Sequence, residues 1–481
     1  MWLRWGRVGE ERGGQNQCIG PMDLPSAKKE FEKKFHDKTK NRWSNRDQFQ
    51  VVSGKYTLLH KDYGADADAA AADDDAGGAD GTGEAKKPVE SALDTRVQSF
   101  MALISDISMM KEQMREIGFD AERMPLGKLQ KRTILEAYKC LQQLSQILVP
   151  GATISGGGGG ASSAGAAMSG GSMGGGGVAP LHRGRIEELS NGFYSLIPHV
   201  SSFADGSGTR ARLPWIDTPA KLKEKIEMVE ALGNIELAQR VISTGKGSGF
   251  DVHPIDAKYN SLGTRLTPID KGGATHAMLA EYIANTHAAT HNTYSIELVQ
   301  AFEVQRDGEA AAFKDVGNRQ LLWHGSRLTN WCGILSTGLR IAPPEAPVTG
   351  YMFGKGVYFA DMVSKSANYC FATSANPDGV LLLSEVALGT PYEKLRAEYE
   401  ADASCRRAGK GHTWGKGKTA PDPAGARTLP GDGGLKVPMG KGKPTDQDGS
   451  SLLYNEFIVY DTQQIKQKFV LRVKFKFQQR Y

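Results

Sequence analysis

The stretch GYMFGKGVYFADMVSKSANYC, residues 350–370, is dense in glycine and aromatic residues and then turns into a short polar run typical of a helix. Its GKG tripeptide suggests a phosphate-binding loop. Such a loop needs GxxxxGK followed by Ser or Thr, whereas Lys355 is followed by Gly356. The GxGxxG pattern of dinucleotide-binding proteins is not satisfied either. The stretch therefore predicts neither kind of phosphate loop.

Two tyrosines of this stretch, Tyr358 and Tyr369, lie on either side of an expected strand-to-helix transition. Two rings placed in this way can face one planar ligand, and Gly354 and Gly356 allow a close approach of the backbone. The alternative is that both tyrosines are core aromatics, and their position alone slightly favours it. The surrounding segments must therefore decide between a ligand slot and a core.

From about residue 250 onward, the sequence pattern is typical of strands separated by short helices such as 277–287. The last run alternates apolar and polar residues with a period of two. This pattern predicts an α+β domain built on antiparallel sheet at 250–481. The Gly/Pro/Lys-rich segment 392–450 is too long for a packed connection, so we expect a functional loop there. The expected strands include IELVQAFEV (296–304), GVLLLSEVAL (379–388), EFIVYD (456–461) and FVLRVKFKF (469–477).

The preceding region, residues 91–245, has apolar residues spaced by three and four, which predicts a helical bundle. Frequent breaks in this pattern argue against a coiled coil. The expected helices are Leu93–Ile117 with a gap at Met110 and Lys111, a helix that follows Pro125 and reaches Leu148, 185–198 closed by Pro198, and one that Thr218 caps and Pro219 begins.

Two low-complexity segments divide the chain. The acidic segment 64–90 cannot bury enough apolar surface to offset its ordering entropy, so we expect a disordered linker. The Gly/Ser/Ala-rich segment 151–180 has helical patterns on both sides. We expect it to be an expanded loop inside the helical domain, because the cost of closing a loop grows slowly with its length.

Bulk composition bounds the class of protein. The 481 residues are 40% hydrophobic and 23% charged, which fits a globular protein of roughly two to four domains. No run of eighteen apolar residues is present, and the start MWLRWGRVG lacks an apolar h-region and a small-residue cleavage site, so we do not expect secretion. Five scattered cysteines without CxxC pairs predict neither a disulfide framework nor a zinc site. Residues 1–62 hold 13 Lys/Arg against 8 Asp/Glu, which fits a polyanion partner or simply a solvated basic face.

Two further segments place polar residues at the ends of apolar strands. LLWHGSRLTN (321–330) puts His324 and Gly325 at the end of one strand, and SLLYNEFIVYD (451–461) puts Glu456 at the start of another. Taken singly, a strand histidine is usually structural and a strand glutamate usually faces water. Together with the two tyrosines they form a far more specific pattern.

These segments, with GLRIAPPEAPVTG before the opening stretch and GKTAPDP after it, resemble the catalytic domain of the poly(ADP-ribose) polymerases. MPLGKLQKR, LSNGFYSLIPH and NTHAATHNTY are similar to the helical regulatory domain of that family and its junction with the catalytic domain. The WGR domain of the family resembles three N-terminal segments, WGRVG, KKFHDKTKNRWSNRDQF and KDYG. Within them, the sequence DKTKNRWSNRDQF is most similar to the smaller, zinc-finger-free nuclear enzymes, notably the plant-type form. The resemblance covers nearly the whole chain outside the low-complexity segments.

The resemblance implies a multidomain protein. It predicts a partial α+β WGR domain at 1–63, an all-α regulatory domain at 91–247 and an α+β antiparallel-sheet ADP-ribosyltransferase domain at 250–481. Because the resemblance starts almost at Met1, the WGR domain is expected to be incomplete at its N-terminus.

The resemblance also implies that NAD+ is the substrate, without a metal. Glu456 would bond the ribose 2′-hydroxyl and stabilise the positive charge that develops as nicotinamide departs. It would also align the acceptor ribose, as chain elongation requires. The implied site consists of the set His324, Tyr358 and Glu456, with His324 on the adenosine ribose, Gly325 and Ser366 on the carboxamide, Tyr369 and Tyr358 on the two faces of the nicotinamide ring, Asn330, Arg340 and Lys365 along the channel, and Met352 on the acceptor side.

The implied function is that of a nuclear, DNA-break-activated ADP-ribosyltransferase that makes poly(ADP-ribose) in DNA repair. We expect the helical domain to restrain the site and a DNA end at Trp5 and Arg7 to release it, so that removal of 91–245 removes DNA dependence. The acceptors of ADP-ribose would be proteins, including the enzyme itself and histones. An accessory factor is a further possible partner, and no membrane partner is expected. The alternatives are a mono-transferase or NAD hydrolase, against which Glu456 argues, and an inactive DNA-end-binding scaffold.

Overall fold

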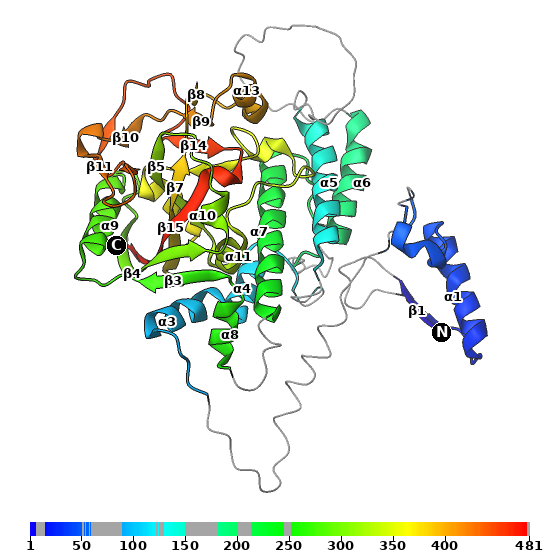
Figure 1. The fold of residues 1–481 in the computed structure, drawn as a ribbon. Helices are drawn as coiled ribbons and strands as arrows, with labels where there is room; N and C mark the ends of the chain where they lie inside the picture. Colours follow the sequence, from blue (N-terminus) through cyan, green and yellow to red (C-terminus); the bar gives the residue numbers. More distant parts are fainter. Residues whose placement is uncertain are drawn as a thin grey trace, which may run out of the picture.

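The computed structural model describes residues 1–5, 15–50, 52, 54–56, 58, 89–121, 124, 129–149, 180–200, 213–244 and 252–478. Most of the acidic segment and of the glycine-rich segment lies outside these residues. Figure 1 shows a helical part beside a part built on sheets, and the predicted multidomain class is confirmed.

The N-terminal module combines a hairpin with a helix. β1 (Trp2–Trp5) pairs antiparallel with β2 (Gln15–Cys18), and α1 (Leu24–Thr39) is followed by the 3₁₀ helix η1 (Trp43–Gln48). The Trp43 ring packs edge-on against Phe31 and Phe35, with ring centroids 5.0 and 5.1 Å apart. These aromatic contacts hold η1 against α1.

Five helices lie in the described residues of the predicted helical region. α5, α6 and α7 bury a core that includes Leu141, Leu144, Phe193, Val229 and Leu232, and Figure 1 shows α7 between the α5–α6 pair and the sheets. The helices are α3 (Thr95–Ile104), α4 (Ile107–Glu116), α5 (Lys131–Leu148), α6 (Pro180–Leu196) and α7 (Pro219–Thr244).

The prediction of a single helix from Leu93 to Ile117 is wrong. The chain breaks after Ile104, because the Asp106 side chain accepts the N–H groups of Ser108 (2.7 Å) and Met109 (3.2 Å) and so begins a new helix. The expected gap at Met110 and Lys111 lies inside α4, where Met110 is fully buried. The cap predicted before α7 is confirmed, since the N–H of Lys221 donates to Thr218 Oγ1 at 3.2 Å.

The part predicted to be catalytic, residues 252–478 and called the catalytic part below, contains two main sheets and a separate two-stranded ribbon within the described residues. The larger sheet has the order β11-β12-β5-β7-β15-β4-β3 and the smaller one β6-β14-β9-β8, with every pairing antiparallel except β12–β5 and β8–β9. The strands are β3 (Thr264–Pro268), β4 (Tyr294–Arg306), β5 (Arg319–Ser326), β6 (Val357–Phe359), β7 (Asp378–Ala387), β8 (Pro391–Lys394), β9 (His412–Gly415), β10 (Thr419–Pro421), β11 (Arg427–Thr428), β12 (Lys436–Val437), β13 (Gly442–Pro444), β14 (Glu456–Val459) and β15 (Ile465–Phe477).

Short helices connect these strands. The α-helices are α8 (Pro254–Asn260), α9 (Ala274–Thr286), α10 (Glu309–Ala312), α11 (Trp331–Thr337), α12 (Val363–Ala367) and α13 (Ala401–Arg407). The 3₁₀ turns are η4 (Leu328–Asn330), η5 (Val348–Gly350), η6 (Asn368–Cys370), η7 (Pro423–Gly425) and η8 (Thr462–Gln464).

The segment 392–450 is not the long open loop that its glycines and prolines suggest. It contains α13, most of β8 and all of β9 to β13. Trp414 stacks on Phe457 with ring centroids 5.9 Å apart, and Leu435 and Val437 are buried. A few apolar residues thus anchor a Gly/Pro/Lys-rich segment to the sheets.

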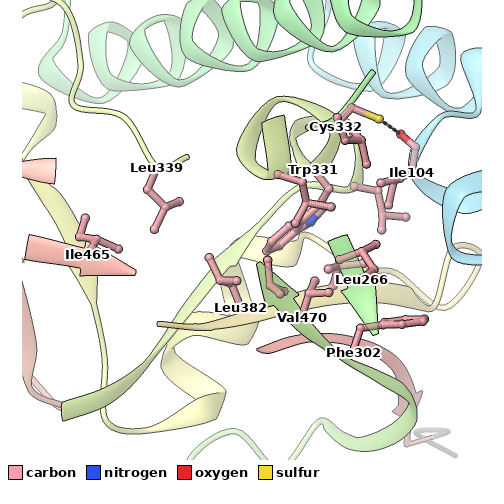
Figure 2. Packing of buried hydrophobic residues seen from close by; sticks show 14 of the residues in the cluster. Ile104, Leu266, Phe302, Trp331, Cys332, Leu339, Leu382, Ile465 and Val470 are labelled. Carbon is pink, nitrogen blue, oxygen red and sulfur yellow. Dashed lines mark hydrogen bonds between the residues drawn. The ribbon is translucent and has the colours of Figure 1, made fainter. Parts of the chain in front are cut away.

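The helical and catalytic parts share a hydrophobic core, shown in Figure 2. Phe100 of α3 packs on Phe302 of β4 with ring centroids 5.1 Å apart, and the Cys332 thiol donates to the Ile104 carbonyl at 3.3 Å. The C-terminal half of α7 contributes Ala238 and Ile242 to the same core. Removal of the helical region would therefore expose catalytic-domain residues that are fully buried here.

Candidate active site

The candidate site lies where the two main sheets meet. Trp323, near the end of β5, exchanges two backbone hydrogen bonds with Ala360, just after β6 (N–H to carbonyl distances 2.8 and 3.0 Å). This bridge brings His324 to Tyr358, whose carbonyl oxygen lies 3.0 Å from His324 Nδ1. The sequence places these two residues 34 positions apart, and the bridge is what joins them.

The hydrogen bond of His324 fixes its chemistry. A carbonyl oxygen only accepts, so Nδ1 carries the proton and Nε2 is left as an acceptor. Burial lowers the pKa of His324 from its usual value, which favours the neutral imidazole. A neutral Nε2 suits the binding of a ligand hydroxyl.

Gly325 and Ser366 are in direct backbone contact. An ideal Cβ on Gly325 would lie 1.9 Å from the Ser366 carbonyl oxygen and 2.7 Å from its carbon. The buried Ser366 hydroxyl donates to the Trp323 carbonyl at 3.0 Å. The structure thus brings together two residues for which the sequence predicted a shared carboxamide contact, and no side chain fits at position 325.

Glu456 begins β14, between β6 and β9. Its Oε1 lies 2.5 Å from Lys365 Nζ. Its Oε2 is buried and has no hydrogen-bond partner among the residues that the structure describes. A buried carboxylate oxygen without a partner is unusual and calls for an explanation, and a hydroxyl donor from a ligand would supply one.

The two tyrosines differ in environment. The Tyr358 hydroxyl donates to the Gly354 carbonyl at 2.8 Å and accepts from the Phe353 N–H at 3.0 Å, which fixes the ring. Burial raises the pKa of Tyr358 far above its usual value, so the phenol stays neutral. The Tyr369 residue in η6 is 53% exposed. One ring can therefore form a fixed wall while the other remains open for stacking.

The remaining predicted channel residues have partners in this structure. The buried Asn330 donates from Nδ2 to Ser326 Oγ at 2.8 Å. The half-buried Met352 accepts the N–H of Glu398 at its carbonyl, at 2.9 Å. Arg340 donates to Asn234 Oδ1 of α7 at 2.8 Å, so the helical domain engages a cation predicted to bind the substrate.

The structure describes only one of the two residues predicted to contact DNA. Trp5 lies in β1, where it pairs in register with Gln15. Arg7 lies outside the described residues. These two predictions stay untested.

Helix α7 packs closely against the catalytic part beside these residues. An ideal Cβ on Gly333 of α11 would lie 2.9 Å from Leu237 Cδ2, and one on Gly350 would lie 3.2 Å from Ile226 Cγ2. The carboxyl of Glu230 on α7 is crowded by protein atoms, which with like charge from Glu227 raises its pKa to about 7, although the residue still reaches solvent. An acidic helix face therefore lies close to Arg340.

Several residues of the site escaped the sequence analysis. Asn234 belongs to no quoted segment, and only the folded chain brings it to Arg340, whereas Asp361 and Asn455 lie within quoted segments but were given no role. Asp361 and Asn455 stand one or a few positions from predicted site residues, which is the sole sequence signal that points to them.

The described residues contain no group of three or more His, Cys, Asp and Glu side chains able to hold a metal ion. All five cysteines lie in the described part of the chain and are free. No helix in that part is both long and apolar enough to cross a membrane.

Three known protein domains match the chain. Residues 274–475 match the poly(ADP-ribose) polymerase catalytic domain, residues 91–259 match the poly(ADP-ribose) polymerase regulatory domain, and residues 1–50 match the WGR domain. The three-domain resemblance drawn from the motifs is therefore confirmed.

The chain is also similar to curated proteins along its whole length. It is 45% identical over 484 residues to poly(ADP-ribose) polymerase 2-A of Oryza sativa subsp. japonica, covering 100% of this chain and 66% of that protein. It is 45% identical over 481 residues to poly(ADP-ribose) polymerase 2 of Arabidopsis thaliana, covering 99% and 68%. With poly(ADP-ribose) polymerase 2 of Homo sapiens the identity is 41% over 484 residues, covering 100% and 75%. The chain thus spans about two thirds of the length of the two plant relatives.

Proposed function

The chain belongs to the poly(ADP-ribose) polymerase family, and from this premise we propose that it is a DNA-break-activated enzyme that transfers ADP-ribose from NAD+ to proteins and elongates poly(ADP-ribose). The observation that carries the proposal is the buried Oε2 of Glu456, which has no hydrogen-bond partner in the described part of the chain, while Lys365 contacts the other oxygen. We further propose that the protein works in the nucleus in the repair of DNA.

The proposed reaction breaks the bond between nicotinamide and ribose. Nicotinamide leaves with the bonding electron pair, and positive charge develops on the sugar. Glu456 Oε2 accepts a hydrogen bond from the ribose 2′-hydroxyl and stabilises that charge where it forms. An acceptor hydroxyl then bonds to the sugar carbon, and its proton passes to solvent water. Lys365 keeps the carboxylate in place throughout.

The other residues of the site bind and orient the substrate. We propose that the Gly325 backbone and the Ser366 hydroxyl bind the carboxamide, because their close contact leaves a narrow, rigid edge. Tyr369 stacks on the nicotinamide ring, Tyr358 walls the opposite face, and His324 Nε2 accepts from the adenosine ribose. Asn330 and Arg340 line the channel, and Met352 borders the acceptor.

The direct test measures NAD+ consumption and product length with and without 5′-phosphorylated nicked DNA. We expect nicotinamide release that rises with DNA and a ladder of products on a gel. A single added unit would favour a mono-transferase, NAD+ loss without protein modification a hydrolase, and no nicotinamide release an inactive DNA-end-binding scaffold.

We propose that the helical domain restrains the site in the absence of DNA. Asn234 of α7 holds Arg340, and α7 packs against α11 and η5, so NAD+ must compete with the helix. A DNA end that stacks on Trp5 and pairs its phosphate with Arg7 would shift this equilibrium. Because α3 and α7 share a core with the sheets, deletion of 91–245 would also destabilise the catalytic domain. A point substitution therefore tests the restraint more directly.

Asn234→Ala is expected to raise DNA-independent activity. Loss of its hydrogen bond frees Arg340 for the substrate, and coupling energies of this kind correspond to about 5–150-fold. NAD+ consumption without DNA should rise, mainly through a lower KM, while the DNA-stimulated maximum stays unchanged. Lys139→Ala on α5, an exposed position paired with Glu136, is the control and should behave as the parent. Unchanged DNA-free activity in a folded Asn234→Ala chain would contradict the restraint.

Protein acceptors complete the proposal. We expect the enzyme to modify itself and other proteins, among them histones, and an accessory factor to direct the acceptor side chain. Labelled NAD+ with the purified chain, and then with added histones, separates these acceptors.

A further inference from the structure

A second buried carboxylate, Asp361, is hydrogen-bonded to the residue before the proposed catalytic glutamate and has no role in the reaction so far. It stands between β6 and α12 and is 4% exposed. Its Oδ2 accepts from Asn455 Nδ2 at 2.7 Å, and Asn455 Oδ1 accepts the Gly417 N–H at 2.8 Å. Because Asn455 directly precedes Glu456, Asp361 is tied to the start of the strand that carries the glutamate.

The other oxygen of Asp361, Oδ1, is buried and has no hydrogen-bond partner among the described residues. Burial raises the pKa of Asp361 to about 6, with the Asn455 hydrogen bond and the charge of Lys365 acting in the opposite direction. An ionised carboxylate in such a place is unfavourable for folding, so its retention calls for a reason other than stability.

Lys365 interacts with both acids. It follows Asp361 by four residues, acts electrostatically on it, and contacts Glu456 Oε1 at 2.5 Å. Further titratable groups of the described residues interact with this cluster, and they are uncharged near neutral pH. Burial raises the pKa of Tyr358 and of Tyr369, which both interact with Glu456. Tyr282 of α9, near Asp361, has its pKa raised well above the usual value by burial, and His291, near Lys365, has its pKa lowered by burial.

We propose that Asp361 is a positioning residue that balances the charge of Lys365, so that Glu456 meets the substrate sugar with a net negative charge. With Asp361 ionised, the three groups together carry one negative charge. With Asp361 protonated, Lys365 acts on Glu456 alone, and the pair presents almost no net charge to the developing oxocarbenium ion. This inference rests on the proposed function and adds a pH dependence to it.

The effect of Asp361 on stability has a definite sign. The pKa of this group is higher in the folded chain than in the unfolded one, so the folded state binds more protons between about pH 4 and about pH 6. Stability from this group is therefore greatest at low pH and is lost as pH rises toward about 6. At neutral pH the penalty is fully present, and an uncharged isostere removes it.

Asp361→Asn in the full chain, assayed with nicked DNA, tests the proposal. We expect kcat for NAD+ consumption to fall about tenfold or more, with KM changed less than about twofold. We expect kcat of the parent to decline on the acid side of its pH profile near pH 6, and this decline should be absent in Asp361→Asn. The melting temperature at neutral pH should be equal or higher, a combination that a purely structural role does not produce.

Two control variants are available. Glu385→Gln alters another buried carboxylate of the same domain, held by Arg319 at 2.6 Å and Lys466 at 2.5 Å; it should lower the melting temperature and keep the acid limb. His291→Gln should also keep that limb, which excludes the imidazole near Lys365 as its source.

Three results would overturn the proposal. A parental pH profile and kcat in Asp361→Asn would show that its charge does not act on the reaction. A fall in kcat together with a lower melting temperature would assign Asp361 a structural role. A parent chain that releases no nicotinamide with DNA would overturn the proposed function and this inference with it, so the two failures are distinguishable.

Discussion

Replacement of Glu456 with glutamine is expected to abolish polymer formation and to lower kcat for nicotinamide release by about 10²–10³-fold. The amide has the shape of the carboxylate but lacks its charge, so the sugar cation loses its stabilising partner. Lys365, which lies 2.5 Å from Oε1 in this structure, is left with an amide. NAD+ binding should survive in part, because the backbone of Gly325 and the ring of Tyr369 are untouched.

The assay compares nicotinamide release and the product ladder of parent and variant, each with nicked DNA. Glu393→Gln is the matched control, since Glu393 of β8 forms an ion pair at 3.1 Å with Lys416, which directly follows β9. That control should keep the parental rate and chain length. Long polymer made by Glu456→Gln would contradict the role assigned to the carboxylate.

Gly325→Ala is expected to destroy NAD+ binding and to destabilise the catalytic domain. The added Cβ would lie 1.9 Å from the Ser366 carbonyl oxygen, and the obstacle is backbone that cannot rotate away. Either β5 or α12 must shift, which separates the two edges of the proposed carboxamide contact. Overpacking of this kind typically costs about 1–3 kcal/mol, and a steric block of the site is expected to remove measurable binding.

Calorimetric titration with a non-reactive NAD+ analogue and thermal melting together test this prediction. Gly272→Ala is the matched control, because no atom lies within 4 Å of its ideal Cβ. Its stability should stay within about 0.5 kcal/mol of the parent. A Gly325→Ala chain that binds the analogue normally would show that the contact between β5 and α12 is not required.

The sequence analysis was most successful where the determinants are local. The Thr218 cap, the strands at 296–304 and 469–477 and the helical class of 91–245 depend on neighbours along the chain, and the structure has them. The break at Asp106 was missed because apolar residues keep a spacing of three and four on both sides of it. Such periodicity indicates which face of a helix is buried, and it does not show where the helix axis changes direction.

Contacts between distant residues could not be predicted in this way. The ion pair of Lys365 and Glu456 and the bond between Arg340 and Asn234 join residues about a hundred positions apart, and nothing in spacing selects such partners. The segment 392–450 was misjudged for a related reason, since its few buried anchors are outnumbered by glycine, proline and lysine.

Helix α7 divides its buried side chains between two clusters. Leu222, Ile226, Val229 and Leu232 belong to the bundle core, whereas Ala238 and Ile242 belong to the core shared with the sheets. The amide protons of its first half should therefore exchange with solvent at a rate set by opening of the bundle, and those of its last half at the slower rate of global unfolding. One continuous helix would then show two protection classes, with the boundary near Asn234.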